Sequence, residues 1–215
     1  EWLEQVTDKM YLAISRSNFQ QEVFETYFDL IAFGTSCLQI EEDKDDIIRF
    51  SSRHIKELYI SENAKGMVDC IYRRFKMTAK ATVEKFGLEN VSSKTQNIFK
   101  KSAFEDVDLC HVVKPRDIYN PKKMDKQNMP FTSCYFEYDS GHIISEGGFK
   151  EFPYVVPRYL KASNEIYGRS PAMNALGDVK VLNKMVEIGM KAAAKQVDPP
   201  LLVSDDSMLA PIRMS

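Results

Sequence analysis

The residues best suited to chemistry are scattered along this sequence. The three histidines are isolated from one another, and no H-E-x-x-H motif occurs. Cys110 and His111 are adjacent, but structural zinc needs four ligands and no second pair follows at a suitable spacing. Because neighbouring residues of a strand point to opposite faces, a strand explains this pair more simply. We expect no catalytic residues, no metal site and no cofactor.

A dense run of carboxylates is the other group that could bind a metal. Its five acidic residues are Glu41, Glu42, Asp43, Asp45 and Asp46. Hard cations bind carboxylate oxygens, but the run lacks the central glycine and distal glutamate of an EF-hand loop. A solvated, charged turn between two strands is the favoured interpretation. A metal-dependent enzyme that acts on nucleic acid stays open as an alternative.

Motifs for phosphate binding and covalent catalysis are missing. The sequence has no G-x-x-x-x-G-K-[ST] loop, no G-x-G-x-x-G after a strand and no G-x-S-x-G elbow. The nearest glycine cluster, Gly147-Gly148, is followed by Phe149 where a phosphate loop has lysine. We predict that the chain is not an enzyme.

Composition narrows the class of protein further. The 215 residues carry 29 basic and 31 acidic side chains, a net charge of -2. This balance excludes a strongly basic binder of nucleic acid but not a local basic stripe. Apolar residues make up 44%, enough for a core. No stretch approaches the roughly 18 apolar residues of a membrane-spanning helix, so we expect no membrane partner.

The N-terminus predicts a piece of a longer protein, and the cysteines indicate the compartment in which it is made. The first residues lack the segments of a signal peptide, and no Met begins the chain, so we expect a piece of a longer protein. No two of the cysteines form a C-x-x-C pair; they are Cys37, Cys70, Cys110 and Cys134. This spacing is typical of free, mostly buried thiols in a reducing compartment.

Helical periodicity marks residues 1–34. An apolar residue recurs every four positions from Trp2 to Ile14, which predicts an amphipathic helix over 1–17. Asn18 is a suitable cap for a second helix that runs to Phe33. Gly34 stands where a C-terminal cap belongs.

Residues 35–160 change to a strand-like pattern. Strands are predicted at 35–42, 47–50, 55–60, 68–73, 107–113, 132–138, 142–146 and 152–156, with short helices at 78–86 and 92–101. Val68, Cys70 and Tyr72 are expected on the one apolar side of their strand. A charged loop covers 114–130. Together these features predict an α+β fold with an antiparallel, β-rich body.

One long helix dominates residues 161–200. It begins at Pro171 and runs to about Val197, where Asp198-Pro199-Pro200 stops it. About 26 residues would span about 39 Å, which is long for a compact domain of this size. Residues 201–215 are expected to form a disordered tail or the start of a further segment.

Two faces of this helix carry distinct patterns. The apolar seam, with spacings of 3 and 4, consists of Val179, Leu182, Val186, Gly189 and Ala193. The lysine stripe, with spacings of 4, 7 and 4, consists of Lys180, Lys184, Lys191 and Lys195. Glu187 lies within the stripe and partly offsets its charge. The seam is suited to packing along another helix, whereas the stripe faces either solvent or a polyanion.

A short turn, Tyr167-Gly168-Arg169-Ser170-Pro171, precedes the helix. We expect Gly168 to adopt a backbone angle that other residues resist. Ser170 is expected to cap the helix, with Pro171 at its first position. The guanidinium of Arg169 could pin the turn to a carboxylate or a carbonyl.

Several short sequences point to a known family. They are Phe152-Pro153, Val156-Pro157-Arg158-Tyr159, Tyr167-Gly168-Arg169-Ser170-Pro171-Ala172, Leu176-Gly177-Asp178-Val179-Lys180-Val181-Leu182-Asn183 and Asp198-Pro199-Pro200, with 33–38 and 66–75 upstream. The chain resembles the head-to-tail connector, or portal, proteins of short-tailed, T7-like bacteriophages. It departs from them at Tyr159, where Trp is frequent, and at Gly177, where Pro is frequent.

The resemblance implies a structural component of the virion. Portal subunits form a dodecameric ring at one capsid vertex, and they also bind tail and capsid proteins. Double-stranded DNA is pumped through the central channel by a separate terminase and leaves through it at infection. The chain would then be a fragment that comprises most of the wing and the first stem helix, with the clip beginning near Leu201. In such a ring, the apolar seam packs between subunits and the lysine stripe contacts DNA without sequence preference.

A protein of another class stays open beside the portal interpretation. A generic adaptor or scaffold module could use its long helix to dock on one partner. Stoichiometry distinguishes the two, because a ring is one large symmetric particle and an adaptor forms a small complex.

Overall fold

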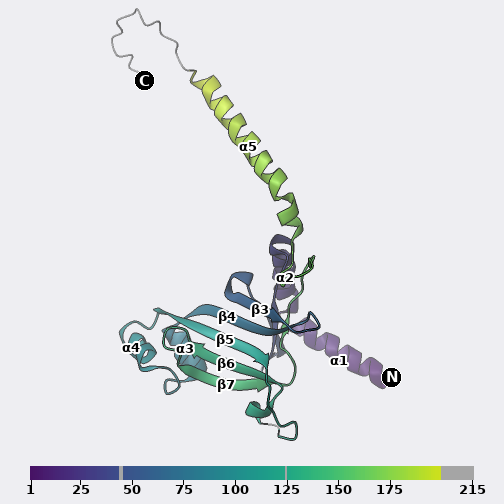
Figure 1. Cartoon of the computed structure of the whole chain (residues 1–215), viewed down its shortest axis with the longest axis vertical. Coiled ribbons are helices and arrows are strands. Elements are labelled where there is room, and N and C mark those ends of the chain that lie inside the picture. Colours follow the sequence, from purple (N-terminus) through teal and green to yellow (C-terminus); the bar gives the residue numbers. More distant parts are fainter. Residues whose placement is uncertain (44–45, 124, 200–215) are drawn as a thin grey trace, which may run out of the picture. The chain divides into compact units, whose positions relative to one another are not determined.

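A computed structural model of the chain describes residues 1–43, 46–123 and 125–199. The chain divides into two compact units, 1–173 and 174–215. Among the described residues, the first unit holds two antiparallel sheets and four helices, and a fifth helix continues into the second unit (Figure 1). The predicted α+β fold is confirmed. The segment 201–215 lies outside the described residues.

The two N-terminal helices form where the sequence predicts them, as α1 (Trp2–Arg16) and α2 (Phe19–Phe33). Gly34 ends α2 in the left-handed conformation, with φ at 77°. Asn18 is the N-cap residue of α2, as predicted, but its side chain makes no capping hydrogen bond. Its amide instead donates to the Phe50 carbonyl at 2.7 Å and accepts from the Phe50 N–H at 3.0 Å. This pairing with a distant strand takes the place of the local cap and fixes the start of α2.

The smaller sheet has the order β2-β1-β8, and its strands are β1 (Leu38–Asp43), β2 (Ile47–Ser52) and β8 (Tyr154–Val155). The acidic run lies where β1 turns into β2. Gln39 donates to Glu41 at 2.5 Å and Arg49 pairs with Asp43 at 3.5 Å, while residues 44 and 45 lie outside the described residues. The strand predicted at 152–156 is reduced to two residues, since Pro153 and Pro157 lack the N–H that a ladder needs.

The larger sheet has the order β3-β4-β5-β6-β7 with every pair antiparallel. Its strands are β3 (Leu58–Glu62), β4 (Val68–Thr78), β5 (Asp106–Pro115), β6 (Phe131–Glu137) and β7 (Ile143–Phe149). The strand predicted at 55–60 begins later, because Ile55–Glu57 form a 3₁₀ turn. His54 caps that turn by accepting from the N–H of Lys56 at 3.1 Å.

The inward face of β4 differs from the prediction. Ile71 is fully buried and Tyr72 is 46% exposed, so the apolar side expected at Cys70 and Tyr72 is wrong. Val68, also expected on that side, does pack against the core. Ile71 shares its face with Arg73, whose guanidinium lies 4.1 Å from the Phe75 ring centroid and pairs with Glu57 at 2.9 Å. An arginine with these partners can occupy an inward position that local alternation assigns to an apolar residue.

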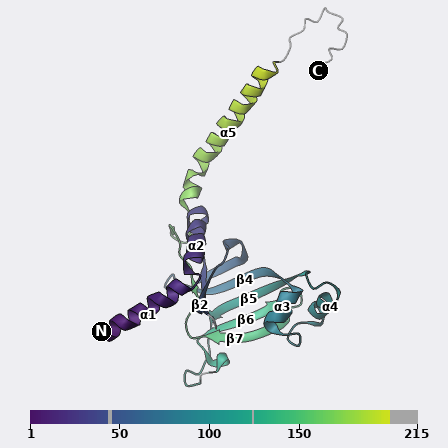
Figure 2. The same cartoon turned by 180° about the vertical axis from the view of Figure 1, so that it is seen from behind.

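Helices α3 (Ala79–Phe86) and α4 (Ser93–Lys101) lie at the end of the larger sheet away from α1 and α2 (Figures 1 and 2). Both form as predicted, with Thr78 and Ser92 as side-chain caps. Glu137 of β6 ties α4 to the sheet by accepting from the Ser92 N–H at 3.0 Å and from the Thr95 hydroxyl at 2.8 Å. Burial alone would raise the pKa of Glu137, but hydrogen bonds from Ser92, Thr95 and Ser140 lower it.

A polar cluster joins the two sheets in the core. His111 of β5 is fully buried and is hydrogen-bonded to Ser133 Oγ at 2.8 Å and to Tyr154 Oη of β8 at 3.0 Å. Its ring stacks on Tyr135 with centroids 3.8 Å apart. Burial, helped by the positive charges of Lys85, Arg73 and Arg53, lowers the pKa of His111 to about 3. The imidazole is therefore neutral in the folded protein.

The four cysteines are free, but Cys37 is the buried one and the other three are half-buried, which corrects the expectation of mostly buried thiols. Burial raises the pKa of Cys37 to about 12. The described residues hold no group of three or more potential metal ligands. Within the same residues, no helix is long and apolar enough to cross a membrane.

The burial of His111 predicts a loss of stability in acid. The unfolded chain binds a proton near the ordinary pKa of 6.5, whereas the folded chain resists it down to about pH 3. Stability therefore falls as the pH drops below 6.5, by about 2 kcal/mol at pH 5. Urea unfolding of the wild type and of His111→Gln at pH 7, 6 and 5 measures the loss of stability in acid that comes from His111. The variant should lack this loss. Equal pH slopes in the two proteins would contradict the assignment.

Candidate functional site

The turn that leads into the long helix is held by a close crossing of two backbones. A Cβ atom added at Gly168 would overlap the Gly34 carbonyl oxygen and lie 2.9 Å from Arg158 Cβ. The φ angle of Gly168 is not positive, so the reason predicted for this glycine is wrong. Glycine is required here because another segment of the chain passes against it.

Hydrogen bonds on both sides of the crossing hold the two segments together. The Gly168 N–H donates to Thr35 Oγ1 at 2.7 Å, and the Tyr159 N–H donates to the Gly34 carbonyl at 2.9 Å. The Ser36 N–H donates to the Pro157 carbonyl at 3.2 Å. The end of α2 and the start of β1 therefore position residues 157–168.

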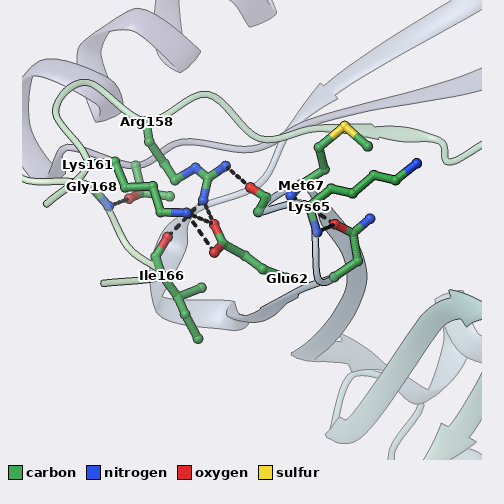
Figure 3. A network of polar contacts seen from close by, with 10 residues as sticks. Glu62, Lys65, Met67, Arg158, Lys161, Ile166 and Gly168 are labelled. Carbon is green, nitrogen blue, oxygen red and sulfur yellow. Dashed lines mark hydrogen bonds and ion pairs between the residues drawn. The ribbon is translucent and has the colours of Figure 1, made fainter. Parts of the chain in front are cut away.

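An acidic residue of β3 fastens the same segment to the larger sheet. Figure 3 shows Glu62 facing Arg158 and Lys161, whose Nζ lies 2.6 Å from a Glu62 oxygen. Arg158 also donates to the Ile166 carbonyl at 3.2 Å and to the Gly66 carbonyl at 3.3 Å. We name Glu62, Arg158 and Lys161 the Glu62 clasp. Sequence reasoning missed it, because its acid and its bases lie about a hundred residues apart.

The remaining residues of the turn also have hydrogen-bond partners, one distant in the sequence and two local. The Ile60 N–H donates to Tyr167 Oη at 3.3 Å. Arg169 forms a two-point ion pair with Glu165. The sequence predicted a carboxylate or a carbonyl as the partner of Arg169 without naming the residue. Ser170 is buried and accepts from the Met173 N–H at 2.9 Å, so it caps the helix as predicted. These contacts fix the first turn of α5 (Pro171–Val197).

The long helix presents its two patterns on opposite sides. At about 100° per residue, the apolar seam and the lysine stripe are centred roughly half a turn apart. Leu182 and Val186 of the seam are exposed on the helix surface. In the described part of its unit, from 174 to 199, the helix has no second element to pack against. The seam is therefore an apolar surface without a cover in its own unit.

One carboxylate divides the lysine stripe. Glu187 pairs with Lys191 at 2.5 Å and with Lys184 at 2.9 Å, and hydrogen bonds from these two lysines lower the pKa of Glu187. Among the described residues, Lys180 and Lys195 have no ion pair. The stripe thus carries one unpaired positive charge toward each end and a partly neutralised centre. Such a surface can contact an array of phosphates without holding it tightly.

The backbone crossing predicts a sharp difference between two glycines. Gly168→Ala should destabilise the first unit by about 2 kcal/mol or more, because the atoms it meets include a backbone carbonyl. Gly177→Ala is the matched control, since a Cβ there meets nothing within 4 Å and alanine favours a helix. Thermal unfolding followed by circular dichroism compares them. If both variants melt with the wild type, the crossing is dispensable.

The comparisons with known proteins agree with one another. The family model for "Bacteriophage head to tail connecting protein" matches residues 1–215. The portal protein of Salmonella phage epsilon15 is 34% identical over 205 residues, which are 94% of this chain and 37% of that protein. The probable portal protein of Bordetella phage BPP-1 is 34% identical over 203 residues, 93% of this chain and 37% of that protein. The chain thus spans a little over a third of the length of these relatives. With a match along its whole sequence, the chain belongs to the bacteriophage head-to-tail connecting protein family.

Proposed function

We propose that this chain is part of a portal subunit, the structural ring component at one vertex of the capsid. DNA enters through the ring during packaging and leaves through it at infection. The family match and the names of the two relatives support this function. The chain spans 37% of each relative, so the proposed ring forms from a longer subunit that contains it.

The observation that carries the proposal is the two-sided character of α5. A helix of 27 residues with an apolar seam needs other helices along its length. Copies of the same helix around an axis provide that cover to every subunit, since a ring repeats one heterologous contact until it closes. The ring is a dodecamer in this proposal, and the α5 helices surround its channel.

The lysine stripe then faces the channel. The seam lies on the side of the helix opposite the stripe and packs on other helices of the ring, so the stripe points to the axis, where the DNA phosphates pass. Attraction by many unpaired lysines would hold DNA in place, whereas Glu187 lowers the charge at the centre of the stripe. The stripe therefore gives transient, sequence-independent contact.

The proposed partners follow from this position in the virion. They are further copies of the subunit, the terminase that pumps DNA, the tail and capsid proteins, and double-stranded DNA itself. The role is structural, and the chemistry of packaging belongs to the terminase.

A charge in the seam should prevent assembly. Leu182→Glu places a carboxylate between neighbouring helices, and we expect ring formation by the full-length protein to fall at least tenfold. Ile188→Glu is the matched control, because Ile188 lies beside the lysine stripe and away from the seam. Light scattering measures the particles in both variants. Rings of normal size and yield with Leu182→Glu would show that the seam is not an interface.

Removing the stripe should change DNA handling and leave assembly intact. Changing all four lysines of the stripe to Gln should reduce the slope of log affinity for DNA against log salt by about 2 to 4. The control changes four exposed lysines elsewhere to Gln: Lys100, Lys101, Lys122 and Lys123. DNA retention by assembled rings, measured across salt concentrations, reads out the difference. Normal retention at every salt concentration would place the stripe outside the channel.

A further inference from the structure

Helix α2 carries an exposed aromatic face that the proposed channel does not use. Phe24, Tyr27, Phe28 and Ile31 follow the spacing of one helical face, and their exposed fractions are 72%, 60%, 67% and 56%. We name these four residues the α2 aromatic face. Contiguous apolar surface of this kind marks an interaction site.

Helix α1 carries a second uncovered face in the same unit. Trp2 and Leu3 are each 71% exposed and Met10 is 61% exposed. No residue of α1 is buried, and in both views the helix runs away from the sheets (Figures 1 and 2). A helix of 15 residues is marginal in water without packing, so α1 needs a cover that its own chain does not give within the described residues.

The charges beside the two faces have opposite signs. Lys9 and Arg16 continue the row of Trp2 at steps of seven residues along α1. Glu25 and Asp29 lie along one edge of the α2 aromatic face, and the sequence of α2 contains no basic residue. Among the described residues, these four charges have no ion pair. Each helix therefore presents an apolar face, and the charge beside the face of α1 is opposite in sign to the charge beside the face of α2.

A groove at the α2 aromatic face is suited to a cationic side chain. Its volume is about 440 Å³, and it is lined by Phe24, Glu25, Phe28, Asp29, Ser52 and His54. Aromatic rings attract a guanidinium or an ammonium group, and the two carboxylates add charge-assisted hydrogen bonds. The groove gives the basic edge of α1 a place to bind.

We infer that α1 of one subunit packs on the α2 aromatic face of a second copy. The inference rests on the proposed ring, because it names a contact between neighbouring subunits. Each subunit offers two different surfaces, α1 toward one neighbour and α2 toward the other. A contact of this heterologous kind repeats from subunit to subunit rather than ending at a dimer, and it forms a ring where its rotation closes.

Charge reversal in the full-length protein tests the contact without needing its exact register. The first variant, Lys9→Glu with Arg16→Glu, makes α1 repel α2, and the second, Glu25→Lys with Asp29→Lys, does the same from the other side. Each alone should assemble at least tenfold less than the wild type. An equimolar mixture of the two should recover rings, because every α1 then meets an α2 of opposite charge.

The mixture separates a contact between subunits from one within a subunit, which mixing cannot restore. Phe28→Glu gives an independent test, since this exposed side chain should be needed for assembly but not for folding. Rings that form normally from both reversal variants and from Phe28→Glu would overturn the inference and leave the proposed function standing. Loss of rings in each reversal variant without recovery on mixing would also overturn it. A wild-type protein that forms no rings would overturn both proposals.

Discussion

The structure of this chain depends on the place where the backbones of Gly34 and Gly168 cross. No side chain fits between them, and the Gly168 N–H donates to Thr35 across a sequence separation of 133 residues. The crossing joins the end of α2, the start of β1 and the turn before α5. The Glu62 clasp then fastens the same segment to the larger sheet. As a result the first turn of α5 begins at a fixed point of the first unit.

Two kinds of apolar surface remain uncovered in the described residues. One is the apolar seam of α5, and the other is the pair of faces on α1 and α2. Charged residues border the faces of α1 and α2, and the lysine stripe lies on the side of α5 opposite the seam. Neither surface therefore resembles the interior of a single domain. The proposed ring would account for both, because neighbours in a ring cover what one subunit leaves open.

The sequence predicts best what is decided locally. Ser170 caps α5 by a bond from a residue three positions away, and Gly34 ends α2 through its own backbone angle. The two patterns of α5 and the position of Glu187 are also visible in the sequence, because they repeat within one helix. Features that depend on distant partners were mispredicted. Asn18 bonds to β2, β4 turns Ile71 inward, and Gly168 is needed for close approach rather than for its own φ angle.

The central claim is that α5 lines the channel of a ring with its seam packed on other helices of the ring and its lysines toward the axis. Electron cryo-microscopy of the full-length protein at physiological salt tests this most directly. The account predicts closed rings in which α5 surrounds the central channel, with Leu182 and Val186 at subunit contacts and Lys180 and Lys195 facing the lumen. A ring with α5 on its outer surface, or a protein that stays monomeric at high concentration, would contradict it.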